Sequence, residues 1–194
     1  DENGGWEQDL EMSFSLRPGD RWEMSFDPLW SRGTDTRQFV MTEGNGRPET
    51  FGTRYVFSHV DLSEISGQFR LNYTFTPNLT LETYVEPFAA SGQFHSFGEL
   101  LAPRRRELLV YGTNGTTIVG NPDGTQTVTD GSESFDIDNE DFNERSFRSN
   151  AVLRWEWRPG SALFLVWQQN RAHRLTWQST DAEAIGDFQL GRDA

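Results

Sequence analysis

Apolar and polar residues alternate with a period of two over several long stretches of the chain. The clearest stretch runs from Ile65 to Phe75, where every second residue is apolar or glycine and the residues between them are polar. This alternation predicts a β-strand with one apolar and one polar face. At about 11 residues it is long enough to cross a bilayer when tilted, whereas strands of globular proteins are nearer 5–6 residues.

The same pattern recurs along the chain and predicts about eight strands. They cover residues 10–16, 22–26, 36–42, 53–60, 65–75, 79–88, 151–157 and 161–169. We therefore expect an all-β fold, an antiparallel up-and-down meander that forms part of a transmembrane outer-membrane β-barrel.

Three connections contain proline followed by Gly or Asn, which favours tight turns. They are Arg17-Pro18-Gly19-Asp20, Thr76-Pro77-Asn78 and Arg158-Pro159-Gly160-Ser161. A three-residue loop at 76–78 keeps the apolar faces in register. It pairs Phe75 with Leu79, Tyr73 with Leu81, Leu71 with Thr83 and Phe69 with Val85. The same rule for the last hairpin pairs Trp157 with Leu163, Trp155 with Leu165 and Leu153 with Trp167.

The segment 90–145 is rich in Gly, Thr, Asn and Asp, and we expect it to be a long polar external loop. Its short apolar stretch Leu108–Tyr111 extends a strand or folds over the rim. Counting strand directions puts the three proline turns at one end and this loop at the other, which is typical of outer-membrane barrels. The connection Gly44–Gly52 fits less well, because it falls on the short-turn side and is long.

The two faces of the predicted strands separate by chemistry. We expect the apolar set to face lipid and the charged set to face the lumen. The apolar set is Ile65, Phe69, Leu71, Tyr73, Leu153, Trp155, Leu165 and Trp167; the charged set is Arg70, Glu82, Arg154 and Glu156. Trp22, Tyr73, Phe75, Trp155 and Trp157 lie beside tight turns, where an aromatic girdle belongs. The alternative is that the aromatics fill a soluble β-sandwich.

One predicted strand departs from this pattern. Ala162, Phe164 and Val166 are apolar on the side that should face the lumen. A plug or a folded loop would have to cover them, since exposed apolar side chains in water are unfavourable.

Composition narrows the function classes. The formal net charge of −13 disfavours nucleic acid as a partner. No run of apolar residues approaches the length of a membrane-spanning helix. The chain has no cysteine, so neither a disulfide framework nor a thiolate metal site is available.

Candidate sites for chemistry are weak. The acidic cluster Asp136, Asp138, Glu140 and Asp141 resembles a calcium loop, but it lacks the turn glycine and distal glutamate of an EF-hand. His59, His95 and His173 show no ligand spacing, and no nucleophile motif occurs. The run Arg104-Arg105-Arg106 either contacts lipopolysaccharide phosphates or an acidic loop, or forms a solvated rim. Glycosylation patterns begin at Asn72, Asn78 and Asn114, and we interpret them as chance matches. We expect no catalytic, cofactor or metal site.

Two motifs resemble the C-terminal region of the family called domain of unknown function 5916. They are YTFTPNL at 73–79 and LRWEWRPGS at 153–161, the latter followed by LFLVWQQ at 163–169. The resemblance implies an outer-membrane barrel that follows a carbohydrate-binding module of family 9 type. That module is not recognisable here, nor is a signal peptide or an aromatic final strand after 191–194. We therefore expect the chain to be cut at both ends.

Our leading hypothesis is a non-enzymatic outer-membrane barrel segment over 1–194, associated with a pore, transport or glycan uptake. Its expected partners are outer-membrane lipid and lipopolysaccharide, with a glycan ligand held by the missing module. The alternatives are a soluble all-β carbohydrate-binding module and a barrel enzyme that uses lumen or rim carboxylates. We also expect an open sheet, one arc of a larger barrel, whose edges lie near Glu7–Arg17 and Ser161–Gln169.

Overall fold

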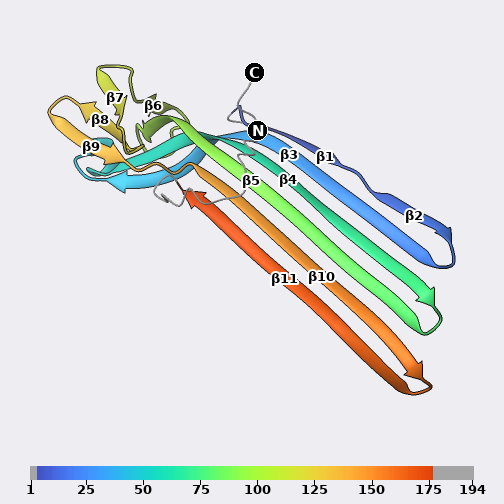
Figure 1. Cartoon of the computed structure of the whole chain (residues 1–194). Coiled ribbons are helices and arrows are strands. Elements are labelled where there is room, and N and C mark those ends of the chain that lie inside the picture. The colour runs from blue at the N-terminus through green and yellow to red at the C-terminus, as the bar shows by residue number, and fades with distance from the viewer. Residues whose placement is uncertain (1–3, 177–194) are drawn as a thin grey trace.

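The computed structural model describes residues 4–176 and contains one long antiparallel sheet and one small sheet (Figure 1). Its strands, in chain order, are β1 (Trp6–Glu11), β2 (Phe14–Gly19), β3 (Trp22–Glu43), β4 (Arg54–Thr76), β5 (Leu79–Leu100), β6 (Leu108–Val110), β7 (Thr116–Gly120), β8 (Gln126–Asp130), β9 (Glu133–Ile137), β10 (Phe142–Arg158) and β11 (Ser161–Thr176). The expected all-β antiparallel fold is confirmed. The two ends at which we expect the chain to be cut, residues 1–3 and 177–194, lie outside the described residues.

The long sheet is an up-and-down meander with two open edges. Its order is β1-β3-β4-β5-β10-β11, with β2 pairing β3 and β6 pairing β5. β1 and β2 follow one another along the same edge of β3. Within residues 4–176 no ladder joins β1 or β2 to β11, so the expected open sheet is confirmed.

Four of the expected strands are halves of two longer ones, and the prediction of separate strands there was wrong. Residues 22–26 and 36–42 both belong to β3, and residues 54–60 and 65–75 both belong to β4. Polar residues interrupt the alternation near Thr34 and Asp61, but these two residues pair with each other, and the two strands stay paired beyond them through a register shift between Asp35 and Gln38. Loss of alternation therefore marks a change of surroundings, not a reversal of the chain.

This merger resolves the misfit of the connection Gly44–Gly52. Because β3 continues to Glu43, the connection to β4 lies at the same end of the sheet as the one between β5 and β10. The three tight turns all lie at the opposite end, as predicted (Figure 1). The tight turns and the long connections between the strands of the long sheet thus lie at opposite ends of it.

The segment expected to be a long polar loop, 90–145, is largely folded, which corrects that prediction. β5 continues to Leu100, and β6 pairs with it through Gly98–Val110 and Leu100–Leu108. The apolar stretch Leu108–Tyr111 therefore does extend the sheet. Beyond it, β7, β8 and β9 form a separate three-stranded sheet. We call residues 101–141 the cap.

The cap gives the molecule its hydrophobic core. Val56, Phe97, Tyr111, Val128 and Ile137 are buried together, and Phe135 and Ile118 pack against them. Two of these residues come from the far ends of β4 and β5 and the others from the cap. The core therefore fixes the cap onto the long sheet at the end away from the tight turns.

Each tight hairpin contains one extra residue just before its turn. Thr76 pairs with Leu79 across Pro77-Asn78, and Phe75 forms a bulge. Tyr73–Leu81, Leu71–Thr83 and Phe69–Val85 pair as predicted, but Phe75 does not oppose Leu79.

In the last hairpin the predicted register was wrong by two residues. Trp155 pairs with Leu163 and Leu153 with Leu165, because Trp157 is the bulge and Arg158 pairs with Ser161. A shift of two residues leaves every side chain on its predicted face.

Candidate functional site

The long sheet carries a continuous apolar face, which we define by the lateral rows of paired residues. One row joins Leu16, Met24, Leu71, Thr83, Ala151 and Trp167, and the next joins Trp22, Tyr73, Leu81, Leu153 and Leu165. A third, farther from the turns, begins Phe14, Phe26, Phe69 and Val85. Because directly paired residues share a face, the predicted grouping of the apolar set onto one face is confirmed.

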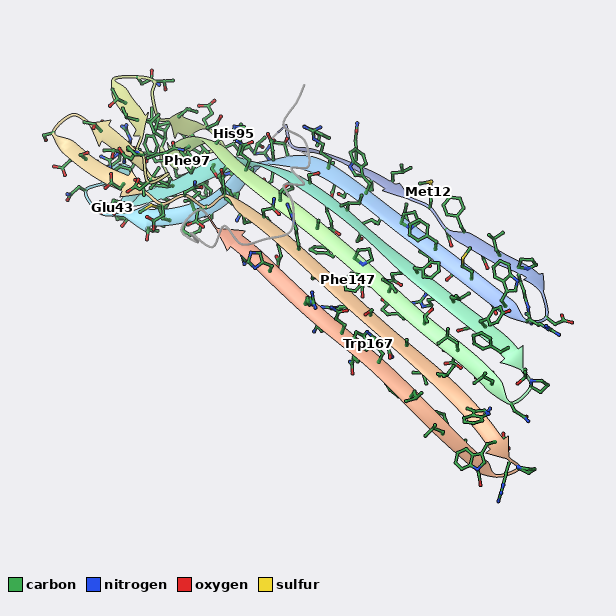
Figure 2. The ribbon with its side chains drawn as sticks, viewed as in Figure 1. Met12, Glu43, His95, Phe97, Phe147 and Trp167 are labelled. Carbon is green, nitrogen blue, oxygen red and sulfur yellow. The ribbon has the colours of Figure 1, made fainter. Side chains whose placement is uncertain are left out.

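The apolar face is bare. Leu16 is 51% exposed, Leu165 is 59% and Trp167 is 63%. Among residues 4–176 no second layer covers it, and the long strands extend away from the cap as a single sheet (Figure 1). In Figure 2, Phe147 and Trp167 lie on this uncovered part of β10 and β11, whereas Phe97 lies within the cap region. A soluble sandwich would bury these side chains against a second sheet.

Aromatic side chains gather at the turn end of the apolar face. Tyr73 and Phe75 meet edge to face at 4.6 Å, and Trp155 and Trp157 do so at 6.3 Å. The bulges place Phe75 and Trp157 beside their neighbours two positions earlier. Trp22 pairs directly with Tyr73, so the aromatics predicted to flank the turns do form a line across the sheet.

The opposite face, which we call the polar face, carries ion pairs along its length. Arg154 contacts Glu156 at 2.9 Å, Arg148 approaches Glu86 at 3.9 Å and Arg70 approaches Asp27 at 3.9 Å. The Tyr84 hydroxyl donates to Glu86 at 2.8 Å, and the Arg70 guanidinium lies over the Tyr84 ring. Register places Glu82 on this face with Arg70, Arg154 and Glu156, as predicted.

The edge strand β11 is apolar on both faces near its turn. Phe164 is 56% exposed and Val166 is 64% exposed, both on the polar face. The expected plug or loop over these residues is not seen among residues 4–176.

A buried ionic cluster joins the cap to the sheet. Arg54 Nη1 lies 2.8 Å from Glu99 Oε2 and 2.9 Å from Asp130 Oδ2, with Arg54 5% and Glu99 1% exposed. Arg47 Nε contacts the other Glu99 oxygen at 3.0 Å. Burial lowers the pKa of Arg54, but the hydrogen bond to Asp130 and the charge of Glu99 outweigh it and raise the pKa above its usual value. The cluster therefore holds its charges by mutual pairing.

Tyr111 closes this cluster from the cap side. Its hydroxyl donates to Glu99 Oε2 at 3.3 Å. Burial raises the pKa of Tyr111 far above its usual value, and the adjacent Glu99 carboxylate raises it further.

The acidic residues considered for calcium do not converge. Asp136 accepts a hydrogen bond from Thr127, and Asp141 accepts one from the backbone N–H of Phe94. Within residues 4–176 no three His, Asp or Glu side chains are placed to hold a metal ion.

His59 and His95 do meet, which sequence spacing did not reveal. They are directly paired across β4 and β5, with ring centroids 5.6 Å apart, and His95 lies 3.3 Å from Asp61. Only the strand register could have shown this contact. His173 lies apart from them on β11, where it pairs with Arg145 of β10.

The remaining candidates lie in connections or on strands. The carbonyl oxygens of Arg105 and Arg106 accept hydrogen bonds from Arg37, so the basic run folds against β3. Asn72 lies within β4, Asn78 in the β4–β5 turn and Asn114 between β6 and β7.

No helix in the described part of the chain is long and apolar enough to span a membrane. No family model, curated protein or solved structure in the three comparisons matches the chain.

Proposed function

We propose that the long sheet is part of the wall of a bacterial outer-membrane β-barrel. The apolar face meets lipid, the polar face lines an aqueous interior, the tight turns face the periplasm and the cap lies outside. The observation that carries the proposal is the bare apolar face: lateral rows of mostly apolar side chains run across the whole sheet, and within residues 4–176 nothing covers them. Soluble monomers rarely expose a patch of this extent.

The hydrogen bonding of the sheet suits a lipid environment. Inside a bilayer every backbone N–H and C=O must be satisfied by other strands, because no water is available. The ladders from β3 to β11 meet this requirement over most of their length. They are interrupted by register shifts toward the cap and beside the tight turns, and between the pairs Ser66–Phe88 and Phe69–Val85, where Pro87 has no N–H to donate. The open edges at β1, β2 and β11 do not meet the requirement, so further strands must complete the wall.

The polar face favours a wide interior. A small closed barrel would force its Arg and Glu side chains into a dry core, and burying ion pairs is costly even when they are matched. An arc of a larger barrel leaves Arg148, Glu86 and Asp27 in contact with water. This arrangement supports a pore, transport or glycan-uptake role without an enzyme site.

The stagger of the hairpins supports tilted strands. Trp22, the first residue of β3 after its tight turn, pairs with Tyr73, and β4 continues three residues beyond Tyr73 to Thr76. Leu79 pairs with Trp155, and β10 again continues three residues to Arg158. A line through the turns therefore crosses the strands obliquely, as a membrane surface crosses the tilted strands of a barrel.

The second candidate is a soluble all-β carbohydrate-binding module. The exposed rings of Trp155, Trp157 and Trp167 favour it, because sugars stack on exposed indoles. These rings belong to the continuous apolar face, however, and a sugar platform does not account for the aliphatic side chains beside them.

The test compares neighbouring positions on opposite faces. In a variant with Trp167 as the sole tryptophan, lipids brominated in their acyl chains should quench its fluorescence strongly in reconstituted vesicles. A second variant moves the tryptophan by one residue, through Trp167→Phe with Gln168→Trp. Its fluorescence should be quenched weakly by the brominated lipids and strongly by acrylamide, a water-soluble quencher. Equal quenching at both positions, or a chain that remains a soluble monomer without detergent, would contradict the proposal.

A further inference from the structure

The two faces of the long sheet differ in the sign of their charge. Carboxylates are concentrated on the polar face, for example Glu11, Asp27, Glu64, Glu82, Glu86 and Glu144. On the apolar face, over 22–34, 59–75, 79–95, 143–155 and 163–173, Asp61 is the sole acidic residue, and it pairs with His95 at 3.3 Å. The same ranges of that face carry Arg32, Arg145 and Arg171. This separation is notable in a chain with a net charge of −13.

The three arginines mark the border of the apolar face on the side of the cap. Arg32 comes two residues after Trp30 on β3, and Arg145 comes two residues before Phe147 on β10. Arg171 lies beyond Trp167 and Gln169 on β11. Each is thus the first charged residue met on its strand when the apolar face is followed away from the turns.

This border slants in the same direction as the line of turns. Arg145 belongs to the lateral row of Ala89, Ile65 and Trp30, which is one row closer to the turns than Arg32. Arg171 pairs with Phe147 and is one row closer again. If the strands tilt as the turns indicate, the three guanidinium groups lie at similar heights above the turn end.

That height matches the thickness of a hydrocarbon layer. The stretches Trp22–Arg32 and Ser161–Arg171 have the same length. At about 3.3 Å per residue and a tilt of about 40°, each rises roughly 25 Å, which is the height of the apolar band on outer-membrane barrels. The arginines then lie where lipid phosphates begin.

We propose that Arg32, Arg145 and Arg171 bind the phosphate groups of lipids in the leaflet on the cap side. This inference rests on the proposed barrel function. The planar guanidinium binds phosphate through paired hydrogen bonds, and Arg32 and Arg171 are exposed. Over the same ranges of the long sheet, the carboxylates other than Asp61, which would repel the phosphates, lie on the polar face. The run Arg104–Arg106 lies in the cap, beyond this border, where its backbone accepts hydrogen bonds from Arg37.

The test measures partitioning of the full chain into vesicles by co-sedimentation. One set of vesicles is phosphatidylcholine alone, and the other contains diphosphorylated lipid A. The triple variant Arg32→Gln, Arg145→Gln, Arg171→Gln is compared with the polar-face triple Arg70→Gln, Arg148→Gln, Arg154→Gln. Both triples lower the net charge equally, so only the location of the lost charges differs.

Wild type should partition more strongly into lipid A vesicles than into neutral ones at low ionic strength. A basic residue at a membrane surface contributes roughly fivefold, so the first triple should lose on the order of a hundredfold of this preference. The polar-face triple should lose little. Salt should weaken the preference of wild type.

Replacing the same three arginines by lysine should keep most of the preference, which separates charge from a folding defect. Equal losses in the two triples, or no loss in the first, would overturn the phosphate proposal alone. A wild-type chain that enters neither kind of vesicle would instead overturn the barrel proposal on which it rests.

Discussion

The backbone N–H of Glu156 donates a 2.8 Å hydrogen bond to the carbonyl oxygen of Asn78, linking the last hairpin to the turn of the hairpin before it. In the same way, the backbone N–H of Thr74, in the β4–β5 hairpin, donates to the carbonyl oxygen of Arg21 in the turn between β2 and β3. In both cases the donor lies two residues before the end of its strand and the acceptor is the second residue of the neighbouring turn. The turn end of the sheet is therefore built from a repeated unit.

Arginine at a lipid-facing position should destabilise the protein in bilayers. We expect Leu71→Arg to cost about 2–4 kcal/mol if the residue sits near mid-bilayer. The neighbouring change Asn72→Arg should cost much less, because its side chain lies on the polar face. Urea titration of the protein folded in vesicles measures both. Similar penalties for the two variants would show that the faces are wrongly assigned.

The turn between β10 and β11 should require glycine at position 160, because the backbone there has a positive φ. Gly160 has φ +78°, a region that costs other residues about 1–2 kcal/mol. We expect Gly160→Ala to destabilise the β10–β11 hairpin by about 1 kcal/mol, read by hydrogen exchange of its ladder amides. Gly19→Ala is the matched control, because Gly19 has no positive φ and an added Cβ meets nothing within 4 Å. An equal effect at Gly19 would rule out this explanation.

The buried ionic cluster should hold the cap on the sheet. Glu99→Gln removes the shared partner of Arg54 and Arg47, and loss of one member of a buried pair costs about 3–5 kcal/mol. We expect faster hydrogen exchange at Val128 and Tyr111, with the ladders near the tight turns unchanged. The control Glu133→Gln alters only an exposed contact with Asn45 and should cost less than about 1 kcal/mol. Unchanged exchange in Glu99→Gln would mean that apolar packing alone fixes the cap.

Cap stability should fall in alkaline solution because of Tyr111. Its pKa is raised on folding, so the unfolded chain loses the proton first, at about pH 10. The stability contributed by the neutral hydroxyl is complete below that pH and declines as the pH rises further. Proteolysis of the cap at increasing pH measures this decline, and Tyr111→Phe should flatten it. A decline that persists unchanged in Tyr111→Phe must come from other groups.

Local patterns predicted the faces of the strands but not their ends. The face on which Leu71 and Leu153 lie follows from the alternation with their near neighbours, so it could be predicted from the sequence. The strand pairing confirms that both lie on the same face. The register at Trp157 could not be predicted, because a bulge is invisible to a period-two pattern. The same limit led to the predicted division of β3 and β4, since the strands stay paired beyond Thr34 and Asp61 through a register shift between Asp35 and Gln38.

The contacts of the cap lay beyond sequence reasoning. Arg54 and Glu99 are 45 residues apart, and their pairing depends on the register of two long strands. Segment 90–145 looked like a loop because its apolar residues, such as Val128 and Ile137, are sparse. Their burial comes from packing against Val56 and Phe97, which belong to other strands. The apolar face was predictable, whereas the cap that terminates it was not.

The hydrogen bond from Glu156 to Asn78 makes the number of hairpins in the long sheet adjustable. Each hairpin brings its own bulge, its own stagger and its own bond to the preceding turn, so it can be gained or lost as a unit. β1 and β2 run toward the turns and β11 runs away from them, so another hairpin added at either edge would continue the antiparallel order. Gene duplication or deletion of a single hairpin would then change the width of the sheet in steps of two strands and leave the register of the others intact.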